Sequence, residues 1–570
     1  MKNCLFKYKS HLATAFIGLC LVSTGCTDKF EEINTDPKGV DDSVTDMVDK
    51  IQSPLDNIIP HQEHRYQLWA NLTTDIFAGF MMGVNDFGGS NNYNYQLRPD
   101  HCAQTYDDLY VFKYTSQYIP QCKALERFEL AAMMQIANVA AILPVVTSYG
   151  PAQYSCVLEG SDTYYYDSEE TIYKRLFQDL KEAVEWLKDF RDSSPSQDLL
   201  DDFKRADKVC DGDIDKWIKF ANTLRLRIAM QLVKVYPDSQ KEAEDAVRDG
   251  VLTNSDSDVV LKSGLMLFRI EDLWNDTRAN ANIISILQGY SDPRLERWFA
   301  TNNADIYSTD DELSPVVEKA TKYLGVRQGV PMTRTEYQGY SKTSRVGIPD
   351  QGPRPVLRVA EAYFLRAEGM LRNWNMGDGT PESLYNEGIH SAWASVLGDE
   401  SGWAGTYESY INGFINTEEG GDFDWELFEG GFGSAPYINY RNQEYNYYIE
   451  ENGKQVGINR ISVRWHDEDS PEKKLQRIIT QKWISFFPTL SSVAWTEYRR
   501  TGYPKLIPIP SDLNYSNGAI DTELQIRRLP FTQSEDRGNT EEVNKALGLL
   551  KGPDNGGTRL WWDVDKGNFE

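Results

Sequence analysis

Two groups of side chains in this chain are of types that bind metal ions. The segment HQEHR places His61 and His64 three residues apart, beside Glu63. This spacing could supply one corner of a metal site, but only six histidines occur and none is spaced as a third ligand. A solvated helix face is therefore the favoured alternative. The run TEEGGDFDWE (417–426) offers carboxylates for Ca²⁺ but lacks the EF-hand spacing, so a solvated acidic loop is the default. We expect no cofactor and leave Ca²⁺ as an alternative.

The sequence contains no recognisable catalytic motif. There is no Walker loop and no GxGxxG, GxSxG or HExxH pattern. Paired acids are common in a chain with 86 Asp and Glu, so a glycosidase pair can be neither selected nor excluded. The sequence therefore predicts a protein that is not an enzyme, with a glycan hydrolase as the remaining catalytic alternative.

Several long loops combine aromatic rings with amide, carboxylate and guanidinium groups. A sugar ring presents an apolar C–H face and a rim of hydroxyls, which suit a flat Trp or Tyr ring and polar side chains respectively. Loop 83–100, the segment LWNDTRAN (273–280) and loop 325–345 have this mixture. Packing of the rings inside the protein is the alternative for each position. The candidate ligand-binding residues are Asn85, Asp86, Asn92, Tyr93, Tyr95, Trp274, Arg327 and Tyr337.

Length and composition restrict the classes of protein to which the chain could belong. The 570 residues include 12% aromatic residues, which is too rich for a disordered chain. The formal net charge is -27 and no basic stripe occurs, which argues against nucleic acid as a partner. The only long apolar run lies at the N-terminus, so the chain is not a multi-span membrane protein.

The N-terminus is typical of an exported lipoprotein. Lys2, Lys7 and Lys9 precede the apolar run LATAFIGLCLV, and small residues then lead to Cys26. We expect residues 1–25 to be a signal peptide and Cys26 to carry the lipid, because LVSTGC resembles a bacterial lipobox. Two or three acyl chains anchor a protein stably in a membrane. The polar residues 26–45 are predicted to be a lipidated tether, and residues 46–570 the folded domain.

The folded part is predicted to be mostly α-helical with long loops. The window 213–236 places Trp217, Phe220, Leu224, Ile228 and Leu232 on one stripe, and Asp213 or Asp215 could cap it. Similar periodicity occurs from Ser168 to Phe190, and a helical pair lies on either side of NMGDGT (375–380). A further helix is expected to end before Pro488. The stretches 83–100, 325–353 and about 400–470 are predicted to be loops.

Four cysteines lie in the folded part, at positions 102, 122, 156 and 210. None has metal-ligand spacing. Disulfides are expected to be stable in an exported protein, but buried free thiols are an equal alternative.

The order of motifs resembles the SusD/RagB family of outer-membrane lipoproteins of Bacteroidota. After the lipobox and FEEINTDPKGV come SYGPAQYS, DKWIKFANTLRLRIAM, VAEAYFLRAEGMLR, AWTEYRRTGYP, RRLP and LWWD. Most of these motifs are helical, and their tryptophans Trp217, Trp483 and Trp495 are assigned to the core. The resemblance implies one mostly α domain with tetratricopeptide-like helix pairs and long ligand-binding loops.

The resemblance also implies a function. Members bind a nutrient, typically an oligosaccharide, at the outer surface of the outer membrane and deliver it to a SusC-like TonB-dependent transporter. They act without catalysis. A peptide-capturing, RagB-like role is the alternative within the family. The net charge favours a neutral glycan over a sulfated or uronate one, although a basic patch of Arg327, Arg334, Lys342 and Arg345 would reverse that preference.

Overall fold

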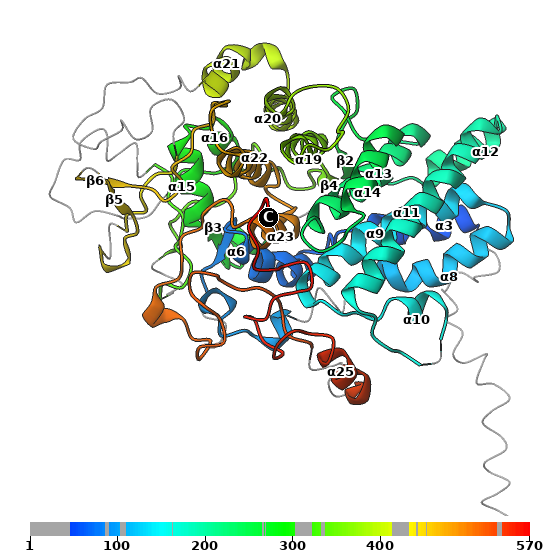
Figure 1. The fold of residues 1–570 in the computed structure, drawn as a ribbon, viewed down its shortest axis with the longest axis horizontal. Helices are drawn as coiled ribbons and strands as arrows, with labels where there is room; N and C mark the ends of the chain where they lie inside the picture. Colours follow the sequence, from blue (N-terminus) through cyan, green and yellow to red (C-terminus); the bar gives the residue numbers. More distant parts are fainter. Residues whose placement is uncertain are drawn as a thin grey trace, which may run out of the picture. The chain divides into compact units, whose positions relative to one another are not determined.

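The computed structural model describes residues 46–85, 91–102, 110–161, 163–264, 267, 269–302, 322–331, 337–412, 433–439, 443–451, 453–532 and 538–570. The chain divides into Met1–Lys50, of which α3 (Met47–Lys50) is described, and Ile51–Glu570. The second unit contains most of the helices (Figure 1). Cys26, the signal peptide and the tether lie outside the described residues.

The second unit begins with short helical segments and one short strand. These are α4 (Gln52–Asp56), α5 (Glu63–Tyr66), the π-helical η1 (Gln67–Thr74), α6 (Asp75–Phe77), β1 (Met81–Gly83) and η2 (Asn92–Asn94). Longer helices follow, with the short α10 among them: α8 (Tyr110–Ala124), α9 (Phe128–Tyr149), α10 (Ser155–Leu158), α11 (Glu169–Asp192), α12 (Gln197–Ala206), α13 (Ile214–Gln231) and α14 (Ser239–Asp249).

The middle of the chain contains three further strands and several helices. In order these are β2 (Val259–Leu261), the π-helical η3 (Arg269–Leu273), β3 (Thr277–Ala279), α15 (Ala281–Gly289), α16 (Arg294–Trp298), β4 (Arg354–Leu357), α19 (Val359–Leu371) and α20 (Pro381–Leu397). The last part has η4 (Glu400–Gly402), α21 (Ala404–Asn412), η6 (Gln443–Tyr445), β5 (Ile449–Glu451), β6 (Lys454–Val456), α22 (Pro471–Ser485), α23 (Ser491–Thr501), η7 (Ser511–Leu513) and α25 (Thr540–Leu547).

The long helices pack against one another in succession. Helix α9 contacts α8 and α11, α11 contacts α13, and α13 contacts α14 and α19. Helix α19 in turn packs on α20 and α22 (Figure 1). The predicted mostly α fold with tetratricopeptide-like pairs is therefore confirmed. Among the described helices, α9 has the length and composition to cross a membrane, but 89% of its most apolar stretch is buried. It is consequently a core helix of this fold.

Helix starts follow from the capping residues in the sequence. Ser168 accepts a hydrogen bond from the backbone N of Thr171 at 3.2 Å, and Asp213 accepts one from Lys216 N at 3.0 Å. Thr380 and Ser383 form a reciprocal capping box at α20, after the NMGDGT break. The predicted stripe of α13 is buried, as are Trp217, Trp483 and Trp495. These sequence predictions are confirmed.

The stretch 400–470 differs from the prediction of a long loop. It contains helix α21 and the β5–β6 hairpin, in which Ile449 pairs with Val456. Tyr407 and Tyr410 lie three residues apart and pack on Trp393 of α20, with ring centroids 5.5 and 4.8 Å away. Because this contact buries one face of a nine-residue segment, tertiary packing stabilises a helix that the local sequence does not indicate.

Buried ion pairs connect the long helices to one another. Arg227 of α13 donates two hydrogen bonds to Glu361 of α19 at 2.7 and 2.6 Å, and Arg500 of α23 donates two to Glu368 at 2.6 and 2.7 Å. Burial raises the pKa of Glu368, but Arg500 and Arg372 outweigh it and bring the value down to about 2. Paired in this way the charges are satisfied, whereas removal of one partner would leave an uncompensated buried charge.

The RRLP and LWWD motifs attach the C-terminal segment to helices α9 and α11. Arg528 Nη2 donates to Tyr149 O at 3.0 Å, and Arg527 Nε donates to Asp563 at 2.7 Å. The backbone N of Trp561 donates to Glu169 at the start of α11 at 2.9 Å. These two C-terminal motifs therefore contact residues 149 and 169, which lie far from them in the sequence.

Substitution of Glu169 gives a pH-dependent test of this attachment. Burial raises the pKa of Glu169 to about 7, against about 4.5 in the unfolded chain. A raised folded pKa contributes stability fully below the unfolded pKa, and this contribution is lost as the pH rises through about 7. We expect Glu169→Gln to increase the free energy of unfolding at about pH 8 by up to roughly 3 kcal/mol, with little gain at about pH 4. Urea unfolding at both pH values measures this.

The matched control is Glu170→Gln, one residue further along the same helix turn. Glu170 is exposed and pairs with Lys174 at 2.7 Å, so its substitution should change stability by less than about 0.5 kcal/mol at either pH. Equal pH dependence in both variants would contradict the assignment.

Candidate functional site

A short antiparallel strand pair brings two of the predicted loop segments together. β1 pairs with β3 so that Met81 faces Ala279 and Gly83 faces Thr277. Directly beyond the pair, Val84 N donates to Asp276 O at 2.8 Å. The start of loop 83–100 and the segment 273–280 are thus neighbours, although about 190 residues separate them in the sequence.

Asp276 connects both segments to a helix. Its carboxylate accepts from Asn85 Nδ2 at 3.1 Å and from Gln67 Nε2 of η1 at 2.9 Å. Asp276 and Gln67 are both buried, so these hydrogen bonds are shielded from water. Gln67 fixes the Asp276 carboxylate, and Asp276 in turn holds the Asn85 side chain at the edge of the site.

Arg278 attaches the third predicted loop. This side chain is 2% exposed and donates to Gln338 O from Nε at 2.8 Å and from Nη2 at 2.7 Å. It also donates to Asn275 Oδ1 at 2.7 Å and to Glu271 O at 3.1 Å. One guanidinium therefore fixes the turn around Asn275, whose φ of 57° is left-handed, against residue 338.

The π-helical turn η3 is tied to the same loop by a buried carboxylate. Glu271 accepts from Thr343 N at 3.0 Å, from Thr343 Oγ1 at 2.7 Å and from Arg345 Nη2 at 2.7 Å. Burial raises the pKa of Glu271 and Arg345 opposes that rise. Lys342 pairs with the next residue, Asp272. These contacts hold the tip of the turn.

Apolar side chains are presented at this tip. Leu273 is 64% exposed, the following Trp274 is half-buried, and Asn275 beside them is also half-buried. An exposed leucine next to a partly exposed indole, on a backbone fixed from both sides, is a small apolar surface with amide groups at its edge. Such a surface suits the C–H face and hydroxyl rim of a sugar.

Three further predicted residues of loop 83–100 lie inside the protein. Asn92 donates to Leu72 O at 2.6 Å and accepts from Arg98 N at 2.9 Å. Tyr93 and Tyr95 are 5% and 2% exposed. These three side chains shape the loop and offer little surface to a ligand in this structure. Asp86 lies outside the described residues.

Arg327 and Tyr337 are also buried. Arg327 donates to Tyr445 O at 2.9 Å and to Pro508 O at 3.0 Å, and its guanidinium lies 4.9 Å from the Tyr447 ring. Tyr337 packs edge-on against Tyr340 with ring centroids 5.0 Å apart. Of the eight predicted ligand-binding residues, the structure thus brings Asn85 and Trp274 together at a partly exposed surface.

Three residues that form or support this surface were not predicted from the sequence. Gln67, Glu271 and Leu273 lie on π-helical segments, where local periodicity gives no signal of a site. Leu273 is the first residue of the segment LWNDTRAN and Glu271 lies two residues before it, so that segment was the one indication in the sequence.

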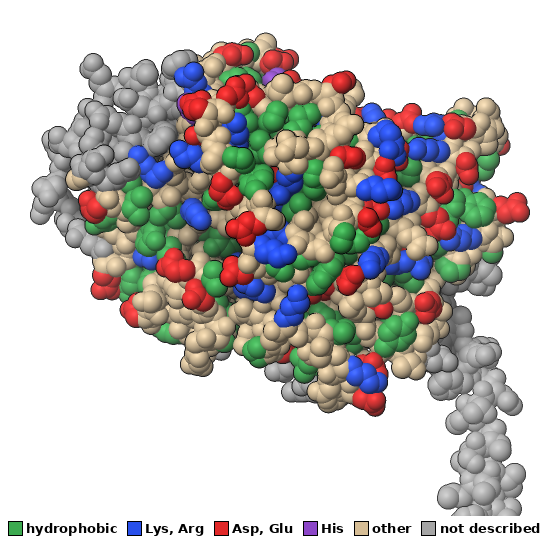
Figure 2. Space-filling view, viewed as in Figure 1, with side chains coloured by type: hydrophobic (Ala, Val, Ile, Leu, Met, Phe, Trp, Pro, Cys, Tyr) green, Lys and Arg blue, Asp and Glu red, His purple; other side chains and the backbone are tan. Residues whose placement is uncertain are grey.

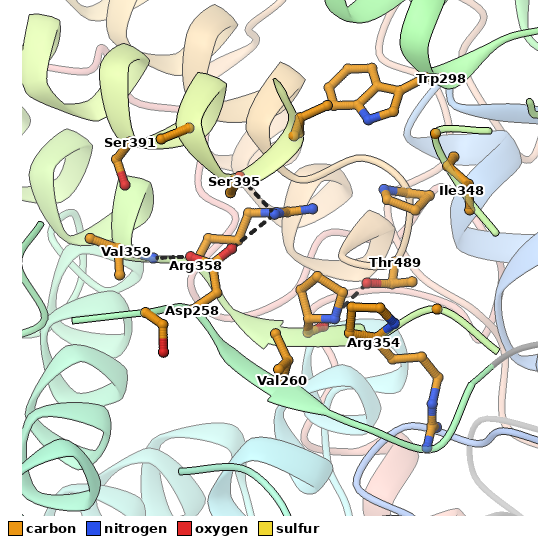
Figure 3. Close-up of a pocket in the computed structure, with 18 of the residues that line it drawn as sticks. Asp258, Val260, Trp298, Ile348, Arg354, Arg358, Val359, Ser391, Ser395 and Thr489 are labelled. Carbon is orange, nitrogen blue, oxygen red and sulfur yellow. Dashed lines mark hydrogen bonds and ion pairs between the residues drawn. The ribbon is translucent and has the colours of Figure 1, made fainter. Parts of the chain in front are cut away.

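A separate cavity of about 510 Å³ lies between β4, α20 and the residues around Pro488 (Figure 3). Arg358 donates to Asp258 at 3.0 Å and to Ser395 at 3.2 Å, and Val359 N donates to Asp258 at 2.8 Å. Thr489 donates to Pro355 O at 3.2 Å. These polar groups hold the start of α19 and strand β4 in place, so we assign them a structural role and not a ligand-binding one.

In the described ranges, no group of three or more His, Cys, Asp or Glu side chains is placed to hold a metal ion. Run 417–426 lies outside these ranges. The four cysteines Cys102, Cys122, Cys156 and Cys210 are buried free thiols, and burial raises the pKa of Cys102 and Cys122 to about 12. The free-thiol alternative is the one that the structure supports.

Comparison with known proteins identifies relatives of the whole chain. Residues 32–407 and 432–563 match the family described as "SusD-like: Susd and RagB outer membrane lipoprotein". No curated protein matches the chain at a significant level.

Solved structures of similar fold cover nearly the entire chain. A chitin-binding SusD homologue from Flavobacterium johnsoniae is 33% identical, with a TM-score of 0.77, and the match covers 92% of this chain and 100% of that one. A SusD homologue from Bacteroides vulgatus is 28% identical, with a TM-score of 0.76 and coverage of 92% and 98%. A SusD-like protein from Bacteroides thetaiotaomicron is 28% identical, with a TM-score of 0.75 and coverage of 91% and 99%.

The Asp276 hydrogen bonds predict a stability effect. Asp276→Ala removes the acceptor for Gln67 and Asn85 and leaves the Gln67 amide buried without this partner. We expect the free energy of unfolding to fall by about 1–3 kcal/mol. Asp276→Asn keeps one acceptor oxygen and should lose less. Chemical denaturation measures both, and an unchanged midpoint for Asp276→Ala would contradict this role.

Proposed function

Because the chain belongs to the SusD/RagB family of outer-membrane lipoproteins, we propose that it captures a glycan on the surface around β1 and β3 and delivers it to a TonB-dependent transporter. The observation that carries this proposal is the convergence of three separate loop segments on Leu273, Trp274, Asn275 and Asn85. The ligand-contacting residues are proposed from this geometry.

The surface has the chemistry that sugar recognition requires. The apolar tip at Leu273 and Trp274 would stack on ring C–H groups, and the amides of Asn85 and Asn275 would pair with hydroxyls. Fixed backbone at the tip lowers the ordering cost of binding. The 33% identical relative is described as chitin-binding, which supports a glycan as the class of ligand.

Membrane attachment is proposed through Cys26. The family is described as outer-membrane lipoproteins, and Cys26 follows the lipobox in the sequence. Acyl chains on Cys26 would tether the folded domain to the outer leaflet at the cell surface. A tether of about twenty residues would let the domain approach a SusC-like transporter without leaving the membrane.

The proposed action is binding without catalysis. Three carboxylates around β1 and β3 in the described part of the chain are engaged by the protein: Asp276 by Gln67 and Asn85, Glu271 by Thr343 and Arg345, and Asp272 by Lys342. A general acid and a nucleophile would need carboxylates that reach the substrate. The purified protein should therefore release no reducing ends from a bound glycan.

Trp274→Ala tests the site. Loss of the indole should weaken binding of a glycan by about ten-fold, equal to about 1.4 kcal/mol, because a stacking face is removed. Isothermal calorimetry against a panel of oligosaccharides, with peptides as the second ligand class, measures it. The matched control is Trp186→Ala, a half-buried tryptophan on α11 beneath Lys123.

Three results would count against the proposal. Equal affinity in the Trp274→Ala variant and the native protein would remove the site. Saturable binding of peptides with silence across the glycans would favour the RagB-like alternative. Measurable turnover would indicate the hydrolase.

A further inference from the structure

The described basic side chains of the three loop segments that meet at the proposed binding surface are engaged by protein partners. In the described parts of the three loop segments and their flanks, five cations form ion pairs with acidic side chains. The pairs are Arg98 with Asp100, Arg269 with Glu63, Lys322 with Glu296, Lys342 with Asp272, and Arg345 with Glu271. A sulfate or uronate group would therefore find each of these charges already balanced.

The other two cations of these segments are buried. Arg278 and Arg327 are 2% and 5% exposed, and both donate to backbone carbonyls, those of Gln338 and Pro508 among them. Their hydrogen-bonding groups stabilise the loops. An anion on the surface could reach them only after these internal hydrogen bonds were broken.

The ion pairs nearest to the apolar tip would oppose an anionic ligand. Arg345 Nη2 lies 2.7 Å from Glu271 and 3.4 Å from Asp272, and Lys342 contacts the same Asp272. An anion that approached Lys342 or Arg345 would also approach these two carboxylates. Because like charges at such distances repel, attraction to the cations would be largely cancelled.

The net charge of the whole protein also disfavours an anionic ligand. The formal net charge is -27, so long-range steering disfavours a polyanion. On the face shown in Figure 2, acidic and basic side chains are interspersed and form no continuous basic area. Three of the four residues of the predicted basic patch, Arg327, Lys342 and Arg345, are described, and each is engaged by protein.

From this charge balance we infer that the ligand of the β1–β3 surface is a neutral glycan, without sulfate or uronate groups. The inference rests on the proposed glycan-binding function and specifies its substrate class. Recognition then depends on stacking at Leu273 and Trp274 and on hydrogen bonds from Asn85 and Asn275, which are insensitive to salt.

The test uses the full folded protein with neutral and anionic probes of similar length. The neutral probes are chitohexaose, cellohexaose and maltohexaose, and the anionic probes are a heparin hexasaccharide and hexagalacturonate. We expect a neutral probe to bind, with an affinity that changes less than about two-fold between about 50 and about 500 mM NaCl. Both anionic probes should bind at least about ten-fold more weakly.

The possible failures separate the two claims. Tighter binding of an anionic probe, lost at high salt, would overturn the neutral-glycan inference and leave the glycan-binding function intact. Binding of peptides with no response to any of these glycans would overturn the proposed function itself, and the inference with it.

A charge variant tests the cause. Asp272→Asn removes the carboxylate that Lys342 and Arg345 share, so the heparin probe should gain about three-fold or more in affinity at low salt. Asp256→Asn, which frees Lys219 at the distant β2 end, changes the net charge equally and is the control. No gain, or an equal gain in both variants, would contradict local pairing as the reason for selectivity.

Discussion

The pairing of β1 with β3 is the constraint on which the proposed site depends. Six residues form the ladder, and its continuation from Val84 N to Asp276 O sets Asn85 beside the turn that contains Trp274. Two strands of this length are not stable alone. Gln67, Asp276 and Arg278 supply the buried hydrogen bonds that fix the pair to η1 and to residue 338. The binding surface is therefore assembled from segments that only the folded chain brings together.

The helical scaffold supports this arrangement through buried charges. Glu361 and Glu368 lie seven residues apart, on one face of α19, and take Arg227 from α13 and Arg500 from α23. A rigid scaffold of this kind limits the motion of the loops attached to it, which lowers the entropy cost of binding a ligand. Ion pairs therefore have two roles in this protein. In the core they specify how the helices pack. Around β1 and β3 they cancel the attraction of the basic side chains for an anionic ligand.

The sequence predicted the scaffold well, but it could not predict which of the candidate side chains are buried. Helices such as α13 and α20 were predictable because apolar periodicity and caps at Asp213 and Thr380 are local signals. Helix α21 was not predicted because it is stabilised by the packing of Tyr407 and Tyr410 against Trp393 of α20, which the local sequence does not reveal. Aromatic content selected loops that meet at β1 and β3, but it could not separate the half-buried Trp274 from the buried Tyr93, Tyr95 and Tyr337. Burial depends on contacts between distant segments, and the sequence of one loop does not contain them.

Hydrogen–deuterium exchange with and without chitohexaose tests the central claim most directly, because it locates the ligand on the protein. The account predicts slower exchange in residues 81–85, 269–280 and 337–345, the three segments joined at β1 and β3. Slower exchange confined to β4 and α20, around the 510 Å³ cavity, would contradict it by placing the ligand elsewhere.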